Sequence, residues 1–300
     1  MVLKRILEFI FFSNYFYGIS AVMLSIEASL QQRVPLNSWV YYMVVFLATI
    51  LYYSYPYTRR TPQGSGNVRT GWYNRHYFLM RWHQLIIIII LAALSLLFIY
   101  HYHGEIILAG IKEWIALLIF PMASILYYDI LPSKRFHLRN IGWLKPFVIG
   151  FCWAGWVTWY SVLFYDIVHS LPFNPGLTGL LLFIKNFMFI TLLGILFDIK
   201  DHSADYLNRV RTFVVQWGLR KTLYRFVLPL AVIGLATFIV YALSQDFHFM
   251  KVLLNMIPFL LLLLVLFSFH RRRPLLYYLV VIDGLLLVKG ICGSLAMYFF

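Results

Sequence analysis

The chain has few acidic residues and almost no cysteine. Asp and Glu together number 11 in 300 residues, against 25 Lys and Arg. The two cysteines, Cys152 and Cys292, both fall in apolar runs, so they provide neither a disulfide framework nor a thiolate metal site. Charged residues make up only 12% of the chain and hydrophobic residues 62%, which excludes a soluble domain of this length.

Several sequence signatures of soluble enzymes are also absent. The chain contains no Gly-rich phosphate-binding fingerprint, no Gly-x-Ser-x-Gly nucleophile elbow and no His-Glu-x-x-His zinc pair. The apolar stretch at the N-terminus contains Glu8 and is longer than a signal-peptide core, so we interpret it as a first membrane span. No linker or separate soluble domain is evident. We therefore expect residues 1–300 to form a single polytopic membrane domain.

Apolar runs near the length needed to cross a bilayer, about 20 residues, recur along the whole chain. They predict an all-α integral membrane protein with about nine transmembrane helices. The predicted spans are 6–26, 38–55, 83–101, 112–130, 146–165, 177–197, 223–244, 252–269 and 275–298.

The basic residues orient these predicted spans. If the N-terminus is cytoplasmic, 20 of the 25 Lys and Arg residues lie in inside segments, whereas only Arg33, Lys112 and Lys251 lie outside. This bias follows the positive-inside rule and predicts an odd number of spans, with the C-terminus outside, in a bacterial inner membrane. The net charge of +14 then reflects topology and anionic lipid headgroups. No basic segment is long enough for a nucleic-acid module, so we expect no nucleic-acid partner.

Three of the 11 acidic residues lie together directly after the predicted span 177–197. They are Asp198, Asp201 and Asp205, and offsets of three and seven residues place them on one face of a helix. Clustered carboxylates repel one another unless a cation joins them, and their oxygens suit Mg²⁺. The alternative is a solvated acidic helix end that pairs with the basic loop behind it.

The acidic segment resembles a known motif. Residues 198–205 read Asp-Ile-Lys-Asp-His-Ser-Ala-Asp, followed by Arg209-Val-Arg-Thr-Phe-Val-Val and Gly218. This is similar to the second aspartate motif of the UbiA-type intramembrane prenyltransferases. The segment from Leu126-Tyr-Tyr to Lys134-Arg resembles the family's Tyr and Lys-Arg segment, with a longer spacing. The predicted nine spans also match the family's layout, in which the active-site loops are cytoplasmic.

The resemblance implies a chemistry. A UbiA-like enzyme transfers a prenyl group from a prenyl diphosphate to a hydrophobic acceptor, here an aromatic compound or a quinone precursor. Asp198, Asp201 and Asp205 would be the catalytic residues and the ligands of Mg²⁺, which neutralises the leaving diphosphate. Charge-assisted hydrogen bonds to the phosphate oxygens are expected from Lys134, Arg135 and Arg211.

One motif of the family is missing. The family carries a first acidic motif, Asn-x-x-x-Asp-x-x-x-Asp, after its second helix, but the chain has no acidic residue between Glu27 and Glu105. Fewer Mg²⁺ ions are therefore expected, and arginines of this loop would have to replace the missing charge. We predict that at least one of them faces Asp201 across a cavity capped by the loops 55–81 and 198–222. The candidates are Arg59, Arg60, Arg69 and Arg75.

Two other functions remain open from the sequence. Loss of the first motif suggests a catalytically inactive UbiA-like protein that binds lipid or a partner. A transporter is disfavoured because the acidic cluster lies at a helix end and no repeated halves are evident. Within the last span, Asp283 is an ionisable residue inside the membrane. It is expected either to have a function or to make a buried contact with Lys289 or Lys185.

Overall fold

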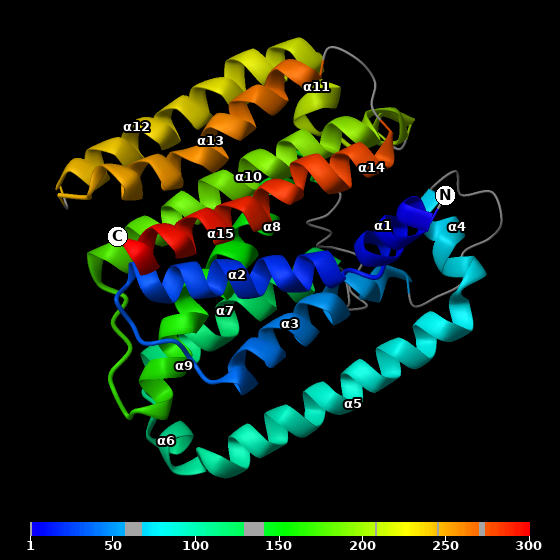
Figure 1. Ribbon diagram of the computed structural model, residues 1–300. Coiled ribbons are helices and arrows are strands. Elements are labelled where there is room, and N and C mark those ends of the chain that lie inside the picture. Colours follow the sequence, from blue (N-terminus) through cyan, green and yellow to red (C-terminus); the bar gives the residue numbers. More distant parts are fainter. Residues whose placement is uncertain (1, 58–67, 129–140, 208, 245, 270–273) are drawn as a thin grey trace.

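A computed structural model describes residues 2–57, 68–128, 141–207, 209–244, 246–269 and 274–300. Within these ranges the chain forms helices joined by turns and loops, and it contains no strand. The all-α class is therefore confirmed for the described residues. Figure 1 shows the helices lying roughly side by side, with the two termini at opposite ends of the bundle.

The helices follow the predicted apolar runs closely. Their bounds are α1 Val2–Phe12, α2 Tyr15–Gln31, α3 Trp39–Ser54, α4 Val68–Arg75, α5 Tyr77–His101, α6 His103–Leu108, α7 Ile111–Tyr128, α8 Lys145–Ala154, α9 Tyr160–Val168, α10 Gly176–Leu207, α11 Phe213–Lys221, α12 Leu228–Ser244, α13 Phe249–Ser268, α14 Leu275–Tyr277 and α15 Gly284–Phe299. Three π-helical stretches, Gly155–Trp159, Thr222–Val227 and Tyr278–Ile282, join α8 to α9, α11 to α12 and α14 to α15.

Six of the described helical segments are long and apolar enough to cross a membrane. They are Tyr77–His101, Lys145–Val168, Gly176–Ser203, Phe213–Leu243, Phe249–Ser268 and Leu275–Phe299. A bent pair, Arg5–Phe12 with Tyr15–Gln31, makes seven if it counts as one span. The chain is thus a multi-pass membrane protein. The remaining two predicted runs form α3 and α7, which have 16 and 18 residues and are not among these segments.

The first predicted span, 6–26, is not one straight helix. Its two halves meet at 61°, and Asn14 at the break adopts a left-handed conformation with φ 69°. The Asn14 amide donates hydrogen bonds to Ser54 Oγ at 2.9 Å and to Tyr73 Oη at 3.2 Å. Because these partners lie on α3 and α4, tertiary contacts fix the bend, and the apolar run alone does not reveal it.

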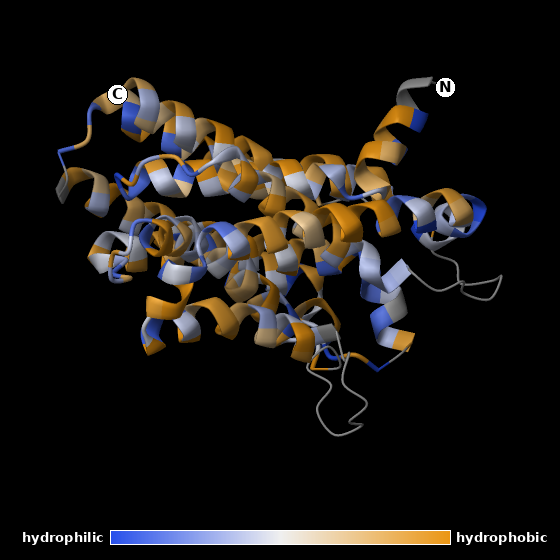
Figure 2. Ribbon diagram, turned by 90° about the horizontal axis from the view of Figure 1, so that it is seen from below, coloured by the Kyte–Doolittle hydropathy of each residue, from blue (hydrophilic) through white to orange (hydrophobic). Residues whose placement is uncertain are grey.

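The outer helices expose their apolar side chains. In an apolar 18-residue stretch of Tyr77–His101, only 11% of the residues are buried inside the protein. Figure 2 shows hydrophobic residues along the outward faces of the bundle. In water such exposure would promote aggregation, whereas in a bilayer these side chains contact lipid tails.

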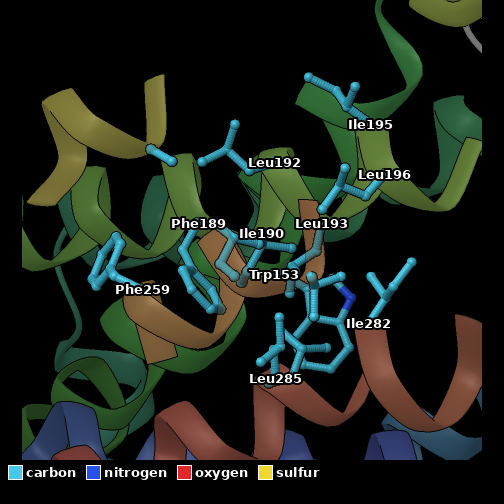
Figure 3. Packing of buried hydrophobic residues seen from close by; sticks show 14 of the residues in the cluster. Trp153, Phe189, Ile190, Leu192, Leu193, Ile195, Leu196, Phe259, Ile282 and Leu285 are labelled. Carbon is cyan, nitrogen blue, oxygen red and sulfur yellow. The ribbon is translucent and has the colours of Figure 1, made fainter. Parts of the chain in front are cut away.

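Helix α10 lies at the centre of the fold. Its side chains pack against α8, α13 and α15 in the largest apolar cluster (Figure 3), which includes Trp153, Phe189, Leu196, Phe259 and Ile282. Glycines allow close helix contact here, as is common in membrane bundles. A Cβ at Gly150 would lie 2.2 Å from Thr191 Oγ1, and one at Gly290 would lie 2.9 Å from the backbone of Met23.

Helices α1, α4, α11 and α14 lie at the end of the bundle that holds the N-terminus (Figure 1). Helix α10 ends there as well, so the acidic cluster and the loop that contains Arg69 and Arg75 are at the same end. The charge bias likewise places both segments on one side of the membrane. That this end faces the cytoplasm remains a prediction.

Candidate functional site

A polar cavity of about 300 Å³ lies at this end of the bundle. Its walls come from α2, α3, α4, α8, α10 and α15 together with adjoining segments. The cavity is partly aromatic, with Tyr17 and Tyr53 stacked at a centroid distance of 4.5 Å. Six Arg, Lys and Asp side chains line it, three of each charge: Arg69, Lys145, Asp198, Lys200, Asp201 and Asp283.

The acidic cluster lies on the last turns of α10, as the sequence predicts. Because α10 is continuous from Gly176 to Leu207, the offsets of three and seven residues hold. Asp198 is buried, with 2% of its surface exposed, and lines the cavity together with Asp201. Asp205 is half-buried one turn further on and is outside the cavity lining.

Two of the three carboxylates are paired with lysines. Lys145 Nζ lies 2.5 Å from Asp198 Oδ1, and Lys200 Nζ lies 2.8 and 2.9 Å from the two oxygens of Asp201. Lys145 is the first residue of α8 and is followed by Pro146, a residue favoured in the first turn of a helix. The start of α8 therefore places a cation against the end of α10.

The acidic cluster can supply ligands for a divalent cation. Asp198 Oδ2 and Asp205 Oδ2 are buried and have no hydrogen-bond partner among the described residues. Burial raises the pKa of the Asp205 carboxyl, and the nearby positive charge of Lys145 opposes this shift. Both carboxylates interact with the Lys145 ammonium, whose single positive charge offsets part of their negative charge. The unused oxygens fit Mg²⁺ in chemistry, although no three His, Cys, Asp or Glu side chains of the described residues form a ready-made metal cluster.

Of the two candidate arginines that the structure describes, Arg69 reaches the cavity. Arg69 on α4 is buried, with 9% of its surface exposed, and lines the cavity together with Asp201. Its guanidinium donates hydrogen bonds to the carbonyl of Phe12, at 3.2 Å, and to the side chain of Asn14. It also lies 4.9 Å from the centre of the Tyr57 ring, in a cation–π contact.

Two of the remaining predicted diphosphate ligands are among the described residues. Arg75 and Arg211 are exposed, and neither lines the cavity. Arg59, Arg60, Lys134 and Arg135 lie outside the described residues. The two predicted capping loops do meet at the cavity, because Tyr57 and Arg69 come from one and Lys200 and Asp201 from the other.

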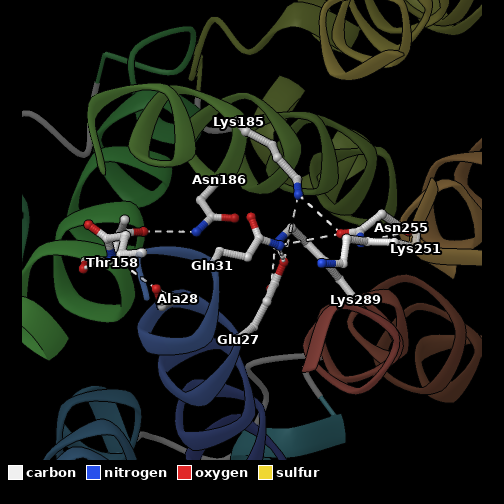
Figure 4. A network of polar contacts seen from close by, with 10 residues as sticks. Glu27, Ala28, Gln31, Thr158, Lys185, Asn186, Lys251, Asn255 and Lys289 are labelled. Atoms are coloured by element: carbon white, nitrogen blue, oxygen red, sulfur yellow. Dashed lines mark hydrogen bonds and ion pairs between the residues drawn. The ribbon is translucent and has the colours of Figure 1, made fainter. Parts of the chain in front are cut away.

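The expected contact between Asp283 and Lys289 or Lys185 is wrong. Asp283 lines the polar cavity and accepts a hydrogen bond of 2.5 Å from the hydroxyl of Tyr17. Lys289 binds Glu27 at the other end of the bundle, where Lys185 also lies (Figure 4). Six helical residues rotate the side chain by about 240°, so Asp283 and Lys289 face different neighbours.

The sequence did not identify Lys145, Lys200 or Tyr17 as residues of the site, although all three line the cavity. Lys145 and Lys200 entered only the count of inside charges, and Tyr17 was treated as part of an apolar span. A signal existed for Lys145, because it begins an apolar run at the same predicted membrane side as Asp198. No comparable signal identifies Tyr17, whose partner Asp283 is 266 residues away.

A second chamber of about 270 Å³ adjoins the polar cavity. The two share Tyr52, Tyr53, Cys152 and Trp153 as lining residues. The indole N–H of Trp153 donates to the Tyr53 hydroxyl at 2.6 Å and so fixes the shared wall. The rest of the chamber is largely apolar and includes Thr49, Phe120, Pro121 and Trp156.

The site therefore combines a charged compartment with an apolar and aromatic one. Such a pair of compartments suits an amphiphile with an anionic head. No family model, curated protein or solved structure matches the chain.

Proposed function

We propose that the chain is a UbiA-like membrane prenyltransferase that transfers a prenyl group from a prenyl diphosphate to an aromatic or quinone-precursor acceptor. The observation that carries this proposal is the polar cavity, where Arg69, Lys145 and Asp198 lie next to an aromatic chamber. The polar end suits a diphosphate and Mg²⁺, and the chamber suits an isoprenoid tail. In the reaction, the bond between the allylic carbon and the diphosphate oxygen breaks, with its electrons leaving on the oxygen. A bond to the acceptor forms and the acceptor releases a proton.

The charges of the cavity support Mg²⁺ dependence. Three cations and three carboxylates line it, so their formal charges cancel before a ligand enters. A diphosphate adds several negative charges, which require further positive charge nearby. When bound, Mg²⁺ would supply that charge and stabilise the leaving group. Asp198 and Asp205 would hold the ion, because each has a buried oxygen without a hydrogen-bond partner among the described residues.

Arg69 and Lys145 would bind the diphosphate together with Mg²⁺. Arg69 is held in place by Phe12, Asn14 and Tyr57, so its orientation is set before the ligand arrives. Arginine binds phosphate oxygens in a planar, often bidentate geometry. Lys145 would exchange its contact with Asp198 for one with the diphosphate as the metal ion enters. Of the two, Arg69 comes from the loop 55–81, in which arginines would have to replace the charge of the missing first motif.

The aromatic chamber would bind the isoprenoid and stabilise positive charge on its allylic carbon. The shared wall of Tyr52, Tyr53 and Trp153 lies between the polar end and the chamber. Faces of electron-rich rings attract a cation, most strongly when water is excluded. The hydrogen bond between Trp153 and Tyr53 would keep these rings in place during the reaction.

The proposed fold has nine membrane spans. Seven are supported by helix length and hydropathy if the α1–α2 pair is one span, and α3 and α7 would complete the set. An odd number agrees with the termini lying at opposite ends of the bundle (Figure 1). The cytoplasmic position of the polar cavity and the bacterial inner membrane rest on the charge bias.

A second candidate function is a catalytically inactive relative that binds an anionic lipid. The ion pairs Lys145–Asp198 and Lys200–Asp201 favour it, because they satisfy carboxylate oxygens that would otherwise bind metal. In that case the lysines would bind the lipid head without Mg²⁺. The dependence on metal therefore separates the two functions.

Binding of farnesyl diphosphate to the purified, full-length protein tests the proposal. We expect Mg²⁺ to tighten binding at least tenfold over a sample with EDTA, and Asp198→Asn to abolish this gain. Farnesol and inorganic diphosphate, each lacking half of the ligand, should both bind more weakly. Binding that is equally tight with and without Mg²⁺ would support the inactive, lipid-binding protein instead. No binding in either condition would exclude the prenyltransferase.

A further inference from the structure

A second group of ionisable side chains is buried toward the end of the bundle that holds the C-terminus. Glu27 on α2 accepts hydrogen bonds from Lys289 Nζ on α15, at 3.0 Å to Oε1 and 2.7 Å to Oε2. The Gln31 amide donates to the same Oε1 at 2.9 Å. Lys185 on α10 is the second cation, and its Nζ lies 3.8 Å from Glu27 (Figure 4). Two lysines thus share one carboxylate.

Lys185 is the less well satisfied of the two lysines. Glu27 Oε1 already accepts hydrogen bonds from Lys289 and Gln31, and Lys185 Nζ lies 3.8 Å from it, beyond hydrogen-bond distance, so Lys185 gains mainly a charge–charge interaction. Among the described residues, its other polar contact is a 3.4 Å hydrogen bond to Asn255 Oδ1. An ammonium has three hydrogens to donate, and a buried charge is costly without a close partner.

The Lys185 side chain lies in the wall of a separate cavity of about 160 Å³ between α10 and α12. Its ammonium is 5.0 Å from the centre of the Phe238 ring, which also lines this cavity. The other walls are mainly apolar and include Met188, Leu230 and Gly234. Ile184, with 42% of its surface exposed, also lines the cavity, so the cavity borders the lipid-facing surface.

We infer that this cavity binds a long-chain fatty acid, with the carboxylate on Lys185 and the acyl chain along the apolar wall between α10 and α12. Charge complementarity selects an anion, because two lysines here face one glutamate. The apolar walls and the lipid-facing border select an acyl chain. Gly234 lines the cavity without a side chain, and a Cβ there would be in ordinary van der Waals contact with the Phe259 ring, at 3.4 Å, so a larger side chain at this position would occupy the cavity.

The depth of Lys185 favours a single-chain carboxylate over a phospholipid headgroup. Lys185 is nine residues from the start of α10, which corresponds to about 13 Å along the helix axis. The hydrocarbon core of a bilayer has a half-thickness of about 15 Å, and phospholipid phosphates remain outside it. A small carboxylate at the end of a flexible chain can reach this depth, whereas a phosphate with a bulky headgroup would have to be drawn into the core.

The test uses the full-length protein in phosphatidylcholine nanodiscs and palmitate labelled with ¹³C at its carboxyl carbon. A carboxyl resonance distinct from that of membrane-dissolved palmitate is expected, and palmitic acid methyl ester should compete at least tenfold more weakly than palmitate. Lys185→Met should weaken palmitate binding at least tenfold. The matched control is Lys251→Met, which removes a lysine at the same end of the bundle but outside this cavity.

A second variant keeps the test valid if Lys185→Met fails to fold. Gly234→Leu fills the cavity and leaves every charge in place, so it should also weaken palmitate binding at least tenfold. Binding that is unchanged in both variants, or equal for palmitate and its ester, would overturn the proposal. Equally strong competition by a phosphatidic acid would assign the site to a phospholipid phosphate and contradict the fatty acid. Palmitate binding should be independent of Mg²⁺, so it can hold or fail separately from the proposed prenyltransferase function.

Discussion

Lys145 Nζ lies 2.5 Å from Oδ1 of Asp198, and this ion pair joins the start of α8 to the end of α10. The Asp198 side chain is 3% exposed and that of Lys145 is 21% exposed, so the pair is largely shielded from water. The two residues are 53 positions apart in the sequence, so the pair joins two distant helices at one charged surface. The pair also explains how an acidic cluster can be stable without a bound metal ion.

Replacing Lys145 with Met should destabilise the protein in the absence of Mg²⁺. The change leaves Asp198 as a buried, unpaired carboxylate, which costs about 3 kcal/mol or more. Thermal unfolding of the purified variant should show a lower midpoint, and millimolar Mg²⁺ should recover part of the loss if the carboxylates bind it. Lys145→Met combined with Asp198→Asn removes both charges and should be more stable than Lys145→Met alone. Equal stability of the parent and the single variant would mean that the ion pair contributes little.

Asp205→Asn should reduce the affinity for Mg²⁺ in the presence of farnesyl diphosphate by about tenfold, the value of one charge-assisted contact. The raised pKa of Asp205 adds a pH dependence. Protons should compete with Mg²⁺ at a higher pH than for an ordinary Asp, so the affinity for Mg²⁺ should fall as the pH falls through that raised pKa. Titration of Mg²⁺ at several pH values measures both effects. The control is Asp246→Asn, at an exposed residue with φ 50°, a conformation that Asn tolerates.

Arg69→Lys should weaken diphosphate binding by about tenfold, because lysine keeps the charge but loses the planar, bidentate geometry. The variant also loses contacts to Phe12 and Asn14, so a lower unfolding temperature is expected as well. Arg75→Lys makes the same change at an exposed position of the same helix and should leave both quantities unchanged. Equal diphosphate affinity in the two variants would show that Arg69 does not bind the diphosphate.

The orientation in the membrane can be tested with single cysteines in a variant that lacks Cys152 and Cys292. Lys112→Cys should react with a membrane-impermeant thiol reagent in intact cells, because the charge bias places this residue outside. Arg75→Cys and Arg211→Cys, both at exposed positions, should react only after the membrane is permeabilised. The reverse pattern would invert the topology and place the polar cavity on the outer side.

The sequence predicted most of the helices because the bilayer imposes a simple rule. A segment that crosses it must be apolar over about 20 residues and must satisfy its own backbone hydrogen bonds. All nine predicted runs coincide with helices, although 6–26 divides at Asn14. That division depends on hydrogen bonds to Ser54 and Tyr73, which no local pattern encodes.

The sequence also determined which side chains are available for chemistry. The spacing of Asp198, Asp201 and Asp205 fixes them on one helical face, because the helix period is a local property. The pairing of these groups was decided only by the tertiary structure. Lys145 against Asp198 and Lys289 against Glu27 each join helices far apart in sequence, and a buried charge takes whichever partner the packing of apolar helices brings within reach.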